Sequence, residues 1–192
     1  MKRWIRVLAC LFGLALVASC ATAPSGPVIE PSALTIEALT EATRLGPGDK
    51  ARIIVYGEPQ LSGEFTVNDK GLISFPLLGD VEASGQTIDQ FKSMIEEALE
   101  ESYFQDPRVA AEIISHRPFY IMGEVNIPGE YAFRPGLTVV KAVATAGGFT
   151  YRANKTVVLV QRAGETEPTR VRLNDTLMVL PGDLIRIQER YF

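Results

Sequence analysis

The chain has 192 residues, with 19 basic and 23 acidic side chains and a formal net charge of −4. This balance argues against a nucleic-acid-binding surface, which needs a basic patch. Beyond the N-terminal segment, no apolar run approaches the ~20 residues that a membrane-spanning helix requires.

The N-terminus has the layout of a secretory signal: basic residues within 1–6, an apolar run Val7–Val17, and the small residues of Val17-Ala18-Ser19-Cys20. As a helix this run rises only about 16 Å, half of a ~30 Å hydrocarbon core, so it is a poor permanent span. The motif resembles a bacterial lipobox, whose cysteine is acylated after cleavage. The resemblance implies a lipoprotein signal peptide at residues 1–19 and lipid attachment at Cys20. By resemblance to the lipoprotein sorting rule, Ala21 in place of Asp favours the outer membrane. The alternative to a lipoprotein signal is an ordinary cleaved signal with an incidental cysteine.

Cleavage before Cys20 leaves 16 basic and 23 acidic residues, a balance of −7. Cys10 leaves with the signal and Cys20 carries lipid, so no disulfide is expected within one mature chain. Residues 20–44 are expected to form a lipid-anchored tether. Its part Ala21–Pro31 is rich in Ala, Ser, Thr and Pro, and a short helical segment is expected at Ala33–Thr43.

A first folded module is predicted at residues 45–115. Strands are expected at Ala51–Tyr56, Glu64–Val67, Leu72–Phe75, Gly79–Glu82 and Val109–Ile114, with a hairpin signal at residues 68–71 joining the second and third. A helix should begin after Thr87, because Thr87 and Gln90 complete a capping box. Its apolar residues share one face, and the acidic residues opposite, including Glu96, are interpreted as solvated.

A second module is predicted at residues 116–192. The expected strands are Phe119–Gly123, Glu130–Phe133, Thr156–Gln161, Thr169–Leu173 and Leu184–Gln188, around a short helix at Thr138–Ala146. The predicted fold class is therefore α+β, with two small β-rich modules of which the second is β-grasp-like.

One turn motif occurs twice. Pro47-Gly48-Asp49-x-x-Arg52-Ile53 recurs as Pro181-Gly182-Asp183-x-x-Arg186-Ile187. Convergent turn chemistry before a strand explains the recurrence adequately.

Several blocks carry a family resemblance in a consistent order. Leu45–Asp49, Ile53–Tyr56, Asp69–Gly71, Phe75–Gly79 and Asp106–Val109 resemble the polysaccharide export domain. A second set, Gly123–Val125, Pro128–Tyr131, Pro135–Val139, Ala146–Phe149 and Pro181–Asp183, resembles an SLBB domain, a soluble-ligand-binding β-grasp. The order of lipobox, export domain and SLBB domain is that of Wza-type outer-membrane polysaccharide export lipoproteins.

The resemblance implies a homo-oligomeric ring at the outer membrane, facing the periplasm, that passes a capsular polysaccharide or exopolysaccharide. Its implied partner is an inner-membrane co-polymerase, often with tyrosine kinase activity. Large members have further SLBB blocks and a C-terminal amphipathic helix that crosses the membrane. This sequence has one SLBB block and stops at Tyr191-Phe192. We therefore expect a periplasmic ring beneath a separate outer-membrane β-barrel, or a ring adaptor.

No enzyme signature is present, so we expect no catalytic residue, metal site or cofactor. His116 is the only histidine and is interpreted as a solvated linker residue, which leaves zinc sites of the usual types nothing to build on. The ligand-binding residues are unknown. Six aromatic side chains inside predicted strands are expected in the core: Tyr56, Phe65, Phe75, Phe119, Tyr131 and Phe133.

Two other functions compete with export. One is a monomeric periplasmic module that binds a glycan or a protein partner, and the other is a small hydrolase. The sequence does not identify the polysaccharide, the subunit number or the inner-membrane partner.

Overall fold

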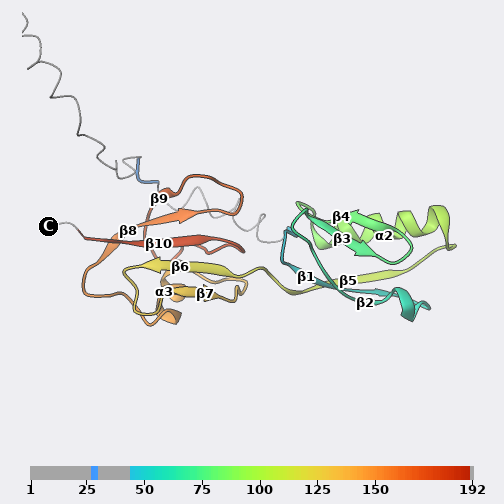
Figure 1. Ribbon diagram of the computed structural model, residues 1–192, viewed down its shortest axis with the longest axis horizontal. Coiled ribbons are helices and arrows are strands. Elements are labelled where there is room, and N and C mark those ends of the chain that lie inside the picture. Colours follow the sequence, from blue (N-terminus) through green and yellow to red (C-terminus); the bar gives the residue numbers. More distant parts are fainter. Residues whose placement is uncertain (1–26, 30–43, 191–192) are drawn as a thin grey trace, which may run out of the picture.

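The computed structural model describes residues 27–29 and 44–190. These residues form two α+β modules side by side along the long axis, joined where β5 (Val109–Ser115) leads into β6 (Phe119–Gly123) (Figure 1). Each module has its own hydrophobic core. One core contains residues between Leu45 and Val109, and the other contains residues between Phe119 and Ile187.

The first module is built on a three-stranded antiparallel sheet of order β2-β1-β5, in which β1 is Lys50–Val55 and β2 is Gly63–Thr66. Side chains of β1 alternate between the core and solvent, so that Ala51, Ile53 and Val55 are buried. The pairing of β1 with β5 runs from Lys50 opposite Ser115 to Val55 opposite Val109. One end of β1 therefore lies at the junction between the modules and the other at the far end of the first module (Figure 1).

The predicted hairpin at residues 68–71 is wrong. Its turn forms, because the Asn68 side chain accepts the N–H groups of Lys70 and Leu72 at 2.9 and 3.0 Å. However, β2 pairs with β1, whereas β3 (Leu72–Phe75) pairs with β4 (Gly79–Glu82) in a separate two-stranded sheet. The short loop at residues 76–78 brings β4 directly back onto β3, so β3 takes its partner there and not from β2.

Helix α2 (Ile88–Ser102) begins as predicted, with both hydrogen bonds of the Thr87–Gln90 capping box. Phe91, Ile95 and Leu99 are fully buried against the sheets, and truncating any of them to Ala would cost ~2–5 kcal/mol. The acidic face is not wholly solvated as expected. Glu96 accepts the backbone N–H of Val109 at 2.9 Å and so connects the helix to the first residue of β5.

The second module contains a five-stranded sheet of order β7-β6-β10-β8-β9. Its remaining strands are β7 (Gly129–Tyr131), β8 (Ala153–Gln161), β9 (Thr169–Arg172) and β10 (Leu184–Glu189). β10 lies between β6, which runs parallel to it, and β8, which runs antiparallel. The helix α3 (Val139–Thr145) packs on this sheet through the buried side chains of Val139, Ala142 and Val143.

Part of the expected tether touches this sheet. Ile29 forms a parallel bridge with Val171, and its backbone N–H donates to the Arg170 carbonyl at 2.9 Å. The expected helix at Ala33–Thr43 lies outside the described residues.

Candidate functional site

The residue expected to carry lipid, Cys20, lies outside the described residues. Within residues 27–29 and 44–190, no group of three or more His, Cys, Asp or Glu side chains is placed to hold a metal ion. In the same ranges, no helix has the length and apolar character needed to cross a membrane. The candidate sites are therefore a surface hollow and the junction between the modules.

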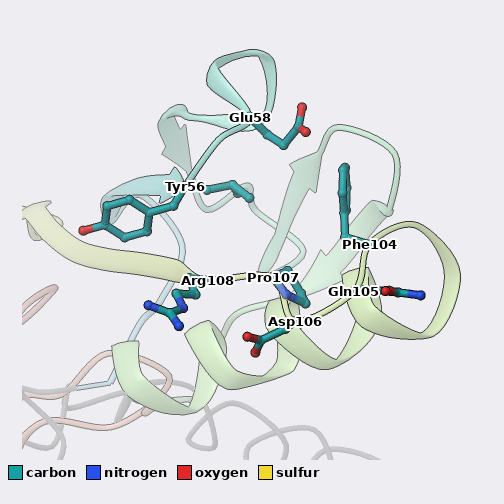
Figure 2. Close-up of a pocket in the computed structure, with 8 residues that line it drawn as sticks. Tyr56, Glu58, Phe104, Gln105, Asp106, Pro107 and Arg108 are labelled. Atoms are coloured by element: carbon teal, nitrogen blue, oxygen red, sulfur yellow. The ribbon is translucent and has the colours of Figure 1, made fainter.

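The hollow lies at the end of β1 that is distant from the second module. It has a volume of about 190 Å³ and is lined by Val55 at the end of β1, by Tyr56 and Glu58 after this strand, and by residues 104–108 before β5. In Figure 2 the Tyr56 ring and the Arg108 side chain extend toward one side of these segments, and Phe104 and Gln105 lie on the other. The hollow is smaller than the ~300 Å³ at which typical small-molecule sites begin.

The lining combines an aromatic ring with charged groups. Tyr56 is 66% exposed, which corrects the expectation that it belongs to the core. The strand alternation explains this, because Ala51, Ile53 and Val55 point inward and the next residue must point outward. Asp106 has a φ of 52°, an uncommon conformation for a non-glycine residue, as is often found at binding sites. An exposed ring on the same side as the Arg108 guanidinium can contact a hydroxyl-rich ligand without enclosing it.

The other expected core aromatics fit the prediction better. Phe75, Phe119 and Phe133 are buried, and Phe65 and Tyr131 pack against the cores while partly exposed.

The repeated Pro-Gly-Asp motif folds in the same way at both positions. Asp49 Oδ2 accepts the N–H of Gly46 at 2.8 Å, and Asp183 Oδ2 accepts the N–H of Leu180 at 2.7 Å. Each carboxylate is 0% exposed and pairs with one guanidinium, Asp49 with Arg117 at 2.9 Å and Asp183 with Arg162. A buried charge needs such a partner, so the recurrence extends beyond turn chemistry to an ion pair.

His116 is not the solvated residue that the sequence suggested. Its side chain is 13% exposed, its Nδ1 lies 3.9 Å from Asp49 Oδ2, and its ring meets Phe133 edge-on at 5.3 Å between centroids. It therefore belongs to the packed junction between the modules.

Burial dominates the electrostatics of Asp183. It raises the pKa of this carboxyl from 3.8 to about 6, although Arg162, the N–H of Leu180 and Arg117 all act in the opposite direction. The repeated motif was the sequence signal for these two carboxylates. Nothing in the sequence indicated their arginine partners, because Arg117 and Arg162 lie far from the turns they contact.

Comparison with known families agrees with this two-module organisation. Residues 37–113 match the polysaccharide biosynthesis/export protein family, and residues 118–172 match the SLBB domain. Together with the relatives below, these matches support a polysaccharide export protein of the Wza type, with one SLBB domain. The resemblance seen in the sequence motifs is thereby confirmed, as is the α+β fold class with an SLBB domain.

The relatives of this chain include proteins of two kinds. The chain is 35% identical over 155 residues to the exopolysaccharide production protein ExoF of Rhizobium meliloti (strain 1021), across 74% of this chain and 34% of ExoF. It is 26% identical over 136 residues to polysialic acid transport proteins KpsD of Escherichia coli, across 70% of this chain and 24% of KpsD. The chain thus spans about a third of ExoF and a quarter of KpsD.

Proposed function

We propose that this chain is a ring-forming component of a capsular polysaccharide or exopolysaccharide export machinery, anchored to the outer membrane by lipid on Cys20 and facing the periplasm. It passes polysaccharide across the periplasm and outer membrane without catalysis. The observation that carries the proposal is the order of an export domain and an SLBB domain, together with similarity to proteins named for exopolysaccharide production and polysialic acid transport. Its partners are further copies of the chain and an inner-membrane co-polymerase.

The geometry supports a conduit component over an enzyme. The hollow is open, and its charged residues Asp106 and Arg108 are exposed, whereas a catalytic site would enclose its groups and exclude water. Weak contacts with a passing polymer suit an open polar surface.

Deleting the gene tests the export role. Polysaccharide should then accumulate in the periplasm, and the wild-type chain should restore its appearance outside the cell, whereas a Cys20→Ser variant should restore it poorly. Mass spectrometry of the mature protein should find an acylated N-terminal cysteine. Unchanged export after deletion would contradict the proposal.

A second function, a monomeric glycan-binding module, has one specific observation in its favour, the hollow beside Tyr56. If a sugar stacks on this ring, Tyr56→Ala should weaken binding of a defined oligosaccharide about fivefold, in line with ~1 kcal/mol for such a contact. Isothermal titration calorimetry measures this, and Tyr151→Ala is the control, because Tyr151 is 84% exposed and lies in the second module. Equal affinity of the wild type and Tyr56→Ala would exclude the hollow as the binding site.

A further inference from the structure

The connection between β5 and β6 is held by both modules. On one side, the backbone N–H of Arg117 donates to Asp49 Oδ1 at 2.6 Å. On the other, the N–H of Gly182 donates to the carbonyl of Pro118 at 3.1 Å, and the N–H of Tyr120 donates to the carbonyl of Asp183 at 2.8 Å. The two Pro-Gly-Asp turns, one from each module, therefore contact adjacent residues of the connection.

The side chain of Arg117 joins the same two turns. Its Nη1 donates to Asp49 Oδ2 at 2.9 Å in the first module. Its Nε lies against Gly182 of the second module, so that a Cβ at Gly182 would approach it to 3.0 Å. Its Cβ would lie 3.4 Å from a Cβ at Gly48. The glycines thus leave the space through which the arginine passes from one turn to the other.

The buried charges at this junction oppose separation of the two modules. Asp49 and Asp183 are both 0% exposed, and the arginine side chains that pair with them are 15% and 18% exposed. If separation of the modules removes Arg117 from Asp49, it leaves this buried carboxylate without its guanidinium, which is strongly unfavourable. If Arg117 instead stays with Asp49, separation withdraws it from Gly182 and from the neighbourhood of Asp183, which keeps its own partner Arg162. Arg117 also acts electrostatically on Asp183, so it influences the carboxylates of both turns.

We propose that Arg117 is a positioning residue that locks the export module and the SLBB module into one rigid body by binding both Pro-Gly-Asp turns. A short connection without this contact would leave the modules free to hinge, which is the usual state of domains joined by a small interface. The inference goes beyond the proposed function and holds for the protein whether or not it exports polysaccharide.

Distances between the two modules test directly whether Arg117 holds them in one rigid body. Spin labels at Glu101→Cys in the first module and Asp175→Cys in the second, both exposed positions, report on the relative placement in the full chain in detergent. Double electron–electron resonance should give a narrow distance distribution for the otherwise wild-type protein. In Arg117→Met the distribution should broaden by at least about twofold, because the modules then move independently.

A second variant keeps the test valid if Arg117→Met alone folds poorly. In Asp49→Asn/Arg117→Met both charges are absent, so no buried carboxylate is left unpaired. The single Asn oxygen can still accept one of the two backbone N–H groups that Asp49 accepts through Oδ1 and Oδ2. This variant should fold, as judged by circular dichroism, and should show the same broadening. The matched control is Arg152→Met, which removes an ion pair with Glu189 inside the second module. Its distribution should remain narrow. A narrow distribution in the double variant, or equal broadening in the control, would overturn the inference.

Discussion

At the scale of single residues, two opposing effects act on the charge of Asp183. It is fully buried and paired with Arg162, yet the net effect of its surroundings is to raise its pKa from 3.8 to about 6. The desolvation of the carboxylate therefore outweighs the attraction of the guanidinium, as is often found for buried ion pairs. The Asp183 carboxylate organises the turn at residues 180–183, although burial makes its ionised form less favourable than it is in water.

This balance predicts how stability depends on pH. Because the folded-state pKa is raised, the folded protein binds a proton between pH 4 and 6 that the unfolded chain does not bind, and stability falls as pH rises through this window. Between pH 4 and 7 the free energy of unfolding of the wild type should fall by up to ~3 kcal/mol relative to that of Asp183→Asn, since one pKa unit corresponds to ~1.4 kcal/mol. Urea unfolding of both proteins across this range measures the difference. The unpaired Arg162 in Asp183→Asn adds only a constant offset, because it does not titrate there. A difference that is flat, or that grows in favour of wild type with pH, would contradict this account.

At the scale of elements, the start of α2 depends on one side chain. The Thr87 hydroxyl accepts the N–H of Gln90 at 3.2 Å, and the Gln90 side chain accepts the N–H of Thr87 at 2.9 Å. Thr87→Ala removes the first bond and should lower the free energy of unfolding by ~1 kcal/mol. Thr87→Ser, which retains the hydroxyl, should differ from wild type by only a few tenths of that amount. Chemical denaturation of the three proteins measures these differences. An equal loss of unfolding free energy in both variants would show that the Thr87 methyl group, and not the cap hydrogen bond, stabilises the helix start.

Local signals explain why so many elements were predictable from the sequence. The capping box at Thr87 and the turn at Asn68 depend on neighbouring residues, so both form where the sequence placed them. Strand pairing depends on segments far apart, so the sequence could not show that β2 joins β1 and β3 joins β4. Burial of Tyr56 was predicted from its residue type, although the alternation along β1 already pointed it outward.

The same distinction between local signals and contacts distant in sequence applies to the candidate sites. The repeated Pro-Gly-Asp motif was visible, but its meaning depends on Arg117, which lies 68 residues from Asp49 in the sequence. His116 seemed a linker residue because only the folded chain brings Asp49 and Phe133 to it.

At the scale of the whole molecule, charge is divided unequally between the modules. Residues 44–115 contain 13 acidic and 6 basic side chains, whereas residues 116–190 contain 7 acidic and 10 basic ones. In a closed ring whose copies stand with their long axes along the symmetry axis, the same module of each copy lies beside its counterpart. The acidic first modules would then repel one another around the proposed ring.

Self-association should therefore strengthen with salt. Raising the ionic strength from ~0.05 to ~0.3 M shortens the screening length to well below 10 Å and weakens this repulsion. Sedimentation velocity of the detergent-solubilised full chain should show a larger oligomeric fraction at the higher concentration. The opposite trend would indicate that copies associate head to tail, with the acidic module of one against the basic module of the next.

The position of β10 in the middle of the five-stranded sheet affects how the molecule is made. β6 and β8 are synthesised well before β10, yet they have no hydrogen bonds to each other and meet only through it. Because a chain is synthesised from its N-terminus, the sheet that residues 119–183 begin therefore stays incomplete until the strand Leu184–Glu189 has also emerged. Such delayed closure, typical of pairings distant in sequence, would keep this half of the protein open until the last strand has been made.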